Sequence, residues 1–258
     1  MSRIEEFTIA YPLNESPRRV WVYLPHSYAQ TKKKYDVLYM FDGHNLFSDE
    51  TATFGKSWGM KEYLDETGLD LVVIGTDCSH LPGGRMDEYC PFDPVIDRWG
   101  DDIITKKGDI TAEWFAHTLK PYCEEHYRVY KDRRHVGIGG SSMGGLMSQY
   151  MITRYNDVYA KAACVSSSTY FCMDPLLELI AETSFRETTI YTDLGSLEAG
   201  SYERTVMGVD ILLRTANAFE EKGCTVYPNL VVGGAHNEAS WEKIVPVFLR
   251  KLYPQLYK

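Results

Sequence analysis

The stretch RHVGIGGSSMGGLMSQY, residues Arg134–Tyr150, decides the fold. Its first part, residues 134–140, is an apolar run that ends in glycines and predicts a buried strand. The segment GLMSQYMITRYN at residues 145–156 predicts the helix that follows directly. A strand joined to a helix through a glycine-rich turn with two serines raises the question of which serine, if either, is chemically active.

The pattern Gly-x-Ser-x-Gly marks a nucleophile elbow, a turn so sharp that side chains two residues either side of the serine would collide with neighbouring chain. Ser142 has Gly140 before it and Gly144 after it, whereas Ser141 has Met143 in the second position. The alternative for a glycine-rich turn is phosphate binding, but neither Gly-x-Gly-x-x-Gly nor Gly-Lys-Ser/Thr occurs here. Ser142 is therefore the candidate nucleophile.

A serine hydroxyl needs a base that takes its proton as attack begins. Of the seven histidines, only His236 follows Ser142, in the loop VVGGAHNEASW after the last predicted strand. The other six precede the serine: His26, His44, His80, His117, His126 and His135. In α/β-hydrolases the chain order is serine, acid, histidine, so His236 is the predicted catalytic base.

The acid should lie between the serine and the histidine, after the penultimate strand. The segment TTIYTDLGSLEAG offers Asp193 and Glu198. Its task would be to hold the imidazole in the useful tautomer and to stabilise the imidazolium. Asp193 is nearer the end of the strand and Glu198 has the longer reach, so the residues alone leave both acids open.

An oxyanion hole needs backbone N–H groups aimed at the developing negative charge. Met143, the residue after the nucleophile, should supply one of them. The loop YMFDGHNLF after an early strand should supply the other, because Gly43 permits close backbone approach. His44 is the predicted donor there, with Asn45 as the next candidate.

Strand-like and helix-like segments alternate along the chain, which predicts an α/β architecture with a mostly parallel sheet. The predicted strands span residues 18–25, 36–42, 69–77, 134–140, 161–168, 188–193 and 224–234, and the predicted helices span 112–127, 145–156, 202–223 and 238–253. No linker or repeat divides residues 1–258, so we expect one domain. A long, irregular, acidic loop at about 77–109 interrupts the alternation and predicts a pocket wall on the substrate side.

Composition limits the classes of partner. The net charge of −9 argues against a nucleic-acid or anionic-membrane surface, and no apolar run has the length of a membrane span. The acidic amino end does not match a secretory signal, so we expect a soluble, cytoplasmic protein. Six scattered cysteines without a CxxC pair predict reduced, mostly buried thiols. We expect no cofactor and no metal ion, and the oligomeric state cannot be inferred.

Together these motifs resemble the esterase family of α/β-hydrolases that includes esterase D (S-formylglutathione hydrolase), enterochelin esterases, feruloyl esterase domains and mycolyltransferases. The matching segments run from about Val20 to Leu252 and are VYLP, VLYMFDGHNLF, EWFAHTLKPYCEEHYRV, GIGGSSMGGLMS and GGAHNEASW. The resemblance implies an α/β-hydrolase fold with three α/β/α layers. It also implies that the acid lies three residues after Gly195, at Glu198, where many members have aspartate, and that His44 and Met143 are the oxyanion donors.

The predicted activity is that of a serine esterase, a carboxylic-ester hydrolase with a Ser-His-acid triad that works through an acyl-enzyme. A small acyl, feruloyl, sugar or siderophore ester would suit it, with Tyr89, Phe92 and Trp99 as candidate aromatics at the mouth. The resemblance leaves the roles of Arg85, Glu88 and Tyr89 open, since an internal Arg–Glu pair could brace the loop. The alternatives are an acyltransferase that passes the acyl group to an alcohol or sugar, and a binding protein without catalysis.

Overall fold

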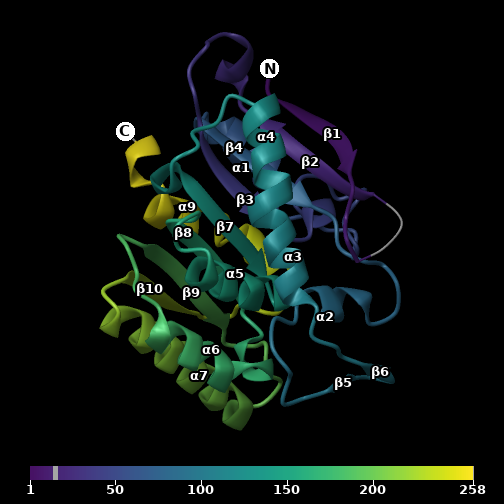
Figure 1. Cartoon of the computed structure of the whole chain (residues 1–258), viewed down its shortest axis with the longest axis vertical. Helices are drawn as coiled ribbons and strands as arrows, with labels where there is room; N and C mark the ends of the chain where they lie inside the picture. Colours follow the sequence, from purple (N-terminus) through teal and green to yellow (C-terminus); the bar gives the residue numbers. More distant parts are fainter. Residues whose placement is uncertain (14–16, 258) are drawn as a thin grey trace.

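The computed structural model describes residues 1–13 and 17–257, apart from the side chains of residues 99 and 102. Within these ranges the chain forms an eight-stranded sheet in the order β1-β2-β4-β3-β7-β8-β9-β10 (Figure 1). The strands are β1 (Arg3–Ile9), β2 (Arg18–Leu24), β3 (Asp36–Met40), β4 (Leu71–Thr76), β7 (Val136–Ser141), β8 (Lys161–Val165), β9 (Thr189–Gly195) and β10 (Thr225–Val231). Each of the seven predicted strand segments is confirmed.

Neighbouring strands are parallel throughout the part of the sheet with the order β4-β3-β7-β8-β9-β10. At the other end of the sheet, β1 and β2 are antiparallel to their neighbours. The carboxyl ends of six strands therefore meet along one edge of the sheet, where α/β proteins place their sites. Sequence patterns missed β1, because Glu5 and Glu6 interrupt its apolar character. This strand lies at the edge of the sheet and is only partly buried, so it needs few apolar residues.

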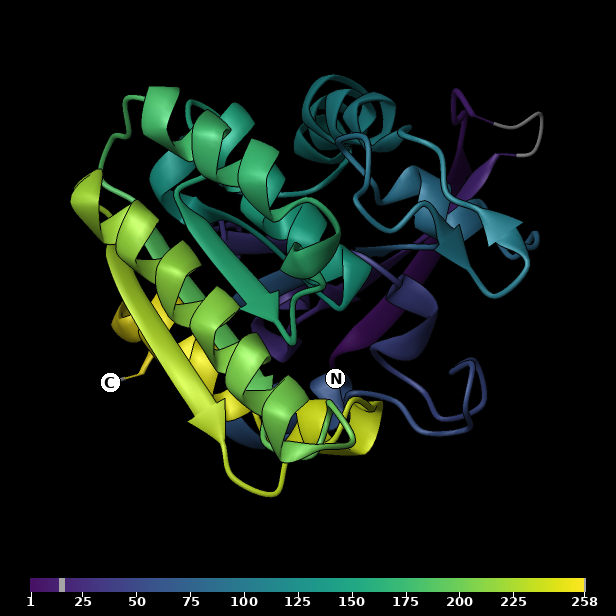
Figure 2. The same ribbon diagram turned by 90° about the horizontal axis from the view of Figure 1, so that it is seen from below.

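Helices cover both faces of the sheet. They are α1 (Met60–Thr67), α3 (Gly108–Trp114), α4 (Lys120–His126), α5 (Met143–Arg154), α6 (Met173–Glu182), α7 (Tyr202–Glu221), α8 (Glu238–Glu242) and α9 (Val245–Leu252). Figure 2 shows the teal helices α3 to α5 on one side of the sheet and the yellow C-terminal helices on the other. The predicted α/β/α layering is confirmed.

Two predicted helices differ in detail from those observed. The segment predicted as one helix at 112–127 is α3, a π-helical turn at Phe115–Leu119 and α4. The segment predicted as one helix at 238–253 is α8 and α9, and Pro246 lies in the first turn of α9. A proline is accommodated there because the first turn leaves backbone N–H groups unpaired anyway. Sequence reasoning did not predict α1 and α6.

The alternation of side chains along the central strands divides the core into two layers. In β3, Val37 and Tyr39 pack into the layer under α3 to α7, and Leu38 and Met40 pack into the layer under α1 and α9. All four side chains are buried. A strand covered on both faces requires a nearly continuous apolar run, which is the pattern that predicted a parallel sheet. The six cysteines are free and buried, as predicted.

The segment at 77–109 is less irregular than its sequence suggests. It contains the short helix α2 (Gly84–Glu88) and a small hairpin of β5 (Arg98–Trp99) and β6 (Asp102–Ile103), which projects beside α2 in Figure 1. A buried ion pair fastens it to the sheet, with Arg18 Nη2 2.5 Å from Glu88 Oε1. Among the helices of residues 1–13 and 17–257, none has the length and hydropathy that a bilayer-spanning segment needs.

A close backbone contact places the turn after β3 against β4. A Cβ on Gly43 would lie 2.4 Å from the carbonyl carbon of Gly75, and a Cβ on Gly75 would lie 2.7 Å from the Cα of Gly43. Neither position has room for a side chain, because the obstructing atoms belong to backbone. This contact explains why glycine follows Asp42 at the end of β3.

Replacing Gly43 by alanine should therefore lower the free energy of unfolding by about 3 kcal/mol, because the backbone must separate to admit the methyl group. Urea denaturation of the purified variant would measure the loss. Gly223→Ala is the matched control, since a Cβ there meets no atom within 4 Å and only the positive φ of 83° is penalised. We expect that control to lose about 1–2 kcal/mol. Equal losses in the two variants would contradict the steric explanation.

Candidate active site

Ser142 lies at the sharp turn between β7 and α5. Its φ of 59° and ψ of −121° put a non-glycine residue in a strained backbone conformation. The flanking glycines are required by sterics, because a Cβ on Gly140 would lie 3.0 Å from the backbone of Gly144, and a Cβ on Gly144 would lie 3.0 Å from Phe41. The turn predicted from sequence spacing is therefore present, with Ser142 at its apex.

The surroundings of the two adjacent serines differ. Ser141 is buried as the last residue of β7, whereas Ser142 is only partly buried. The segment after β8 holds Ser142 on both sides: Ser142 N–H donates to Val165 O at 3.0 Å, and Ser168 N–H donates to Ser142 O at 3.0 Å. The Ser142 hydroxyl is 3.2 Å from the hydroxyl of Ser168. Sequence reasoning did not identify Ser168, whose only signal is the triple serine that ends the predicted strand at 161–168.

His236 and Glu198 lie in contact at the ends of β10 and β9. His236 Nδ1 is 2.8 Å from Glu198 Oε2, and the histidine side chain is 40% exposed while the glutamate is 7% exposed. The other carboxylate oxygen accepts hydrogen bonds of 2.6 Å from Gly195 N–H and from the Ser166 hydroxyl. The carboxylate is thus oriented by the protein and presents its free oxygen to the imidazole.

Asp193, the other candidate acid, points into a different environment. One of its oxygens accepts from Ser166 N–H at 2.8 Å, and the second accepts from the Tyr191 hydroxyl at 2.8 Å. Burial raises the pKa of Asp193 to about 7, against the lowering effect of these hydrogen bonds. The structure therefore brings Glu198, and not Asp193, to His236.

Ser142 and His236 are connected through the segment after β8. Ser166, with a positive φ of 45°, donates its hydroxyl to Glu198 and accepts a 2.9 Å hydrogen bond from Trp241 Nε1. The Trp241 ring in turn meets the His236 ring edge-on at 5.2 Å. Among the described hydrogen bonds none joins the Ser142 hydroxyl to His236, and this bond often tightens only when substrate binds. Trp241 was not predicted, although it lies in the same motif as His236.

Backbone N–H groups are available at the two predicted oxyanion positions. Asn45 N–H donates to Asp42 O at 2.9 Å, which removes the second candidate. Within the described part of the chain, neither Met143 nor His44 donates its N–H to another backbone or side-chain group. Met143 begins α5, a twelve-residue helix whose N-terminal partial charge favours an anion. These two groups could therefore receive an oxyanion.

Arg85 braces the turn that carries His44. Its guanidinium donates to both carboxylate oxygens of Asp42 at 2.8 and 2.7 Å, and Asp42 has a φ of 55°. Burial by itself would raise the pKa of Asp42, but the adjacent guanidinium outweighs it and lowers the pKa. The sequence suggested that Arg85 and Glu88 could form an internal pair. In the structure Arg85 pairs with Asp42, and Glu88 pairs with Arg18.

Three aromatic side chains were expected at the mouth. The side chain of Trp99 lies outside the described residues, and packing assigns the places of Tyr89 and Phe92. Tyr89 is 1% exposed and packs edge-on against Phe41 at 4.9 Å, so it belongs to the core and not to the mouth. Phe92 is partly buried against Tyr150, with ring centroids 5.3 Å apart.

Glu238, two residues after His236, was not identified from the sequence. Its side chain is 4% exposed, and burial raises the pKa of its carboxyl group, with the Asp42 carboxylate adding to the rise.

The whole fold resembles those of several solved hydrolases. An IroE-like serine hydrolase from Shewanella oneidensis superposes with a TM-score of 0.77 at 17% identity, covering 98% of this chain and 80% of that one. The BES protein from Bacillus cereus superposes with a TM-score of 0.72 at 17% identity, covering 96% of this chain and 94% of that one. The siderophore hydrolase EstA from Aspergillus nidulans superposes with a TM-score of 0.71 at 16% identity, covering 97% of this chain and 95% of that one. The architecture is thus that of the α/β-hydrolase fold.

Sequence comparison narrows this class to a family. The family model described as "Putative esterase" matches residues 13–256 of this chain. The protein YbbA of Bacillus subtilis (strain 168) is 28% identical over 186 residues, which cover 70% of this chain and 69% of YbbA. The chain belongs to the putative esterase family, as its motifs predicted.

The raised pKa of Asp193 has a consequence for stability. Between the ordinary aspartate value of 3.8 and about 7, the folded protein binds this proton and the unfolded chain does not. The contribution of Asp193 to the free energy of unfolding is therefore lost as the pH rises across this window. We expect the wild type to lose stability relative to Asp193→Asn over the same window, as measured by urea denaturation at a series of pH values. Parallel pH profiles of the two proteins would refute the assignment.

Proposed function

We propose that this protein is a serine carboxylic-ester hydrolase in which Ser142 is the nucleophile, His236 the general base and Glu198 the acid of the triad. The observation that carries the proposal is the 2.8 Å contact between His236 and Glu198, at the same edge of the sheet as the strained turn of Ser142. Membership of the putative esterase family supports the reaction class.

In the first half of the proposed reaction, the Ser142 hydroxyl attacks the ester carbonyl while His236 Nε2 takes its proton. Glu198 holds Nδ1 and stabilises the imidazolium that forms. The N–H groups of Met143 and His44 stabilise the tetrahedral oxyanion, and the N-terminus of α5 adds favourable partial charge. When the intermediate collapses, the ester C–O bond breaks and His236 gives its proton to the leaving alcohol, which leaves an acyl-enzyme on Ser142.

Deacylation repeats these steps with water as the nucleophile. His236 removes a proton from water as the water oxygen attacks the acyl carbonyl, and the proton returns to Ser142 when the acid product leaves. Transfer of the acyl group to an alcohol would follow the same path with the alcohol in place of water. Analysis of products with added acceptor alcohols separates the two activities, because transfer yields a new ester and hydrolysis yields the free acid.

For the substrate we propose a small acyl, feruloyl, sugar or siderophore ester. Two solved structures with the same fold carry the names ferulic acid esterase and siderophore hydrolase. Arg85 donates from Nε and Nη2 to the two carboxylate oxygens of Asp42, so much of its charge is already neutralised within the protein. Initial rates with a panel of esters, in which acyl length and alcohol vary independently, would assign the specificity.

The identity of the nucleophile can be tested by two adjacent substitutions. Ser142→Ala should lower kcat for a short p-nitrophenyl ester by about 10⁴-fold or more, because the members of a triad act as a unit. It should also abolish labelling by a fluorophosphonate probe. Ser141→Ala, one residue earlier at the buried end of β7, is the matched control and should still be labelled. Near-normal hydrolysis by Ser142→Ala would exclude the proposed mechanism.

The two candidate acids make a second pair. Glu198→Gln should lower kcat by about 10⁴-fold, because the amide cannot stabilise the imidazolium and can hold the wrong tautomer. Asp193→Asn preserves the size of a side chain that does not contact His236 and should retain most of the activity. Steady-state kinetics on both variants, with circular dichroism to check folding, decides between them. The reverse order of effects would assign the triad acid to Asp193.

A further inference from the structure

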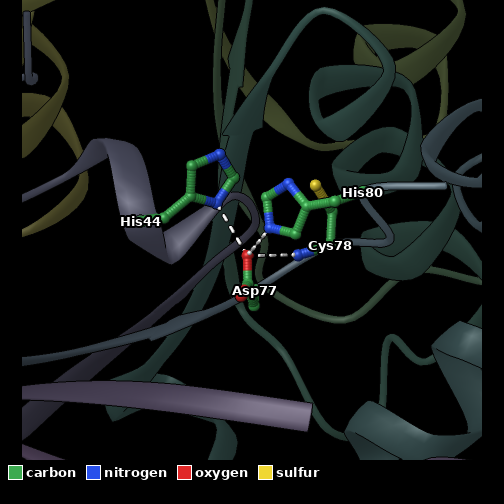
Figure 3. A group of neighbouring side chains, drawn as sticks. All are labelled: His44, Asp77, Cys78 and His80. Carbon is green, nitrogen blue, oxygen red and sulfur yellow. Dashed lines mark hydrogen bonds and ion pairs between the residues drawn. The ribbon is translucent and has the colours of Figure 1, made fainter. Parts of the chain in front are cut away.

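Four side chains with metal-binding atoms converge beside the turn that carries His44. They are His44, Asp77, Cys78 and His80, and their ligand atoms all lie within 4.8 Å of one another (Figure 3). His44 comes from the turn after β3 and the other three from the loop after β4. Because β3 and β4 are adjacent parallel strands, their carboxyl ends bring these two segments together.

The His44 ring is held in an orientation that leaves one nitrogen facing the cluster. The residue is 7% exposed, and its Nε2 lies 3.0 Å from the Thr53 hydroxyl. Its Nδ1 lies 2.9 Å from Asp77 Oδ1, so this buried nitrogen faces the carboxylate within the cluster. Metal-bound histidines are commonly arranged in this way, with one ring nitrogen held by a neighbour and the other directed at the ion.

Asp77 is the centre of the cluster. Its Oδ1 is 2.9 Å from His80 Nε2 as well as from His44 Nδ1, and it also accepts the N–H of Cys78 at 3.0 Å. Figure 3 shows both imidazoles directed toward this oxygen. The His80 side chain is 65% exposed, whereas Asp77 is 17% exposed. An ion could therefore reach the cluster from the His80 side.

We propose that these four residues bind a Zn²⁺ ion. Two imidazole nitrogens, a carboxylate oxygen and a thiolate are the donors that Zn²⁺ takes in tetrahedral sites. Mg²⁺ and Ca²⁺ prefer sites built from oxygen atoms, so this donor set disfavours them. Binding would require small movements of the side chains to equalise the ligand distances, and it would release the Cys78 thiol proton to solvent. No metal was expected from the sequence, because the cysteines form no CxxC pair and the acidic loop at 77–109 has no known metal-binding spacing.

The site would tie the loop after β4 to the residue whose N–H is the proposed oxyanion donor. Metal binding depends on the His44 side chain and catalysis on its backbone, so the two proposals can fail separately. The alternative is that Asp77 serves only as a structural acceptor for two histidines. That arrangement needs no thiol, since the Cys78 side chain makes none of the contacts with Asp77.

Titration with Co²⁺, followed by displacement with Zn²⁺, tests the proposal directly. The wild type should bind one Co²⁺ per chain, with the intense visible bands of tetrahedral cobalt and a thiolate-to-cobalt charge-transfer band. Cys78→Ser should lose the charge-transfer band, and His80→Ala should weaken binding by more than about tenfold. His80 is exposed, so its replacement should not unfold the protein.

His26→Ala is the matched control, because His26 is an exposed histidine outside this cluster and should leave binding unchanged. The same titration on Ser142→Ala separates this proposal from the catalytic one, since the Co²⁺ site should survive loss of the nucleophile. Failure of the wild type to bind one Co²⁺, or an identical affinity and spectrum in Cys78→Ser and His80→Ala, would overturn the proposal.

Discussion

The strained backbone of Ser142 is the constraint on which the site depends. A φ of 59° at the end of β7 turns the chain directly into α5 and leaves the Ser142 side chain at the apex. The turn is stable because Gly140 and Gly144 let the end of β3 approach, and Phe41 N–H donates to Gly139 O at 2.9 Å there. The same approach brings the Gly43–His44 turn toward the elbow, so one backbone geometry organises both the candidate nucleophile and its oxyanion donors.

The acids of the site show how environment separates groups of one chemical type. Glu198 lies on a turn, accepts two short hydrogen bonds and contacts a partly exposed histidine. Asp193, five residues earlier, is buried in the strand, where desolvation raises its pKa to about 7. Both carboxylates accept from Ser166, one through its hydroxyl and the other through its N–H. This serine therefore connects a buried acid with the one that faces His236.

Two ion pairs hold acidic and basic groups together beside the turn that carries Ser142. Arg85 is engaged by Asp42, and Glu88 is engaged by Arg18, so the loop at 77–109 is fastened to the sheet at two points. The His44 cluster adds a third connection between this loop and the turn after β3. Polar contacts of this kind position backbone groups, and they explain why a segment rich in charged residues packs closely against the sheet.

From the sequence alone, local patterns determined every strand of the main sheet except β1, together with the sharp turn and the order of serine, acid and histidine, because periodicity and spacing are properties of neighbouring residues. The Gly-x-Ser-x-Gly spacing also identified Ser142, and not Ser141, as the candidate nucleophile. The residues alone left Asp193 and Glu198 open, and the family resemblance favoured Glu198. The tertiary structure shows that Glu198 meets His236, since the two acids are similar in type and position and differ in what surrounds them. Only the tertiary structure decided the Arg85–Asp42 pair and the His44 cluster, whose members are distant in sequence and are brought together by adjacent parallel strands.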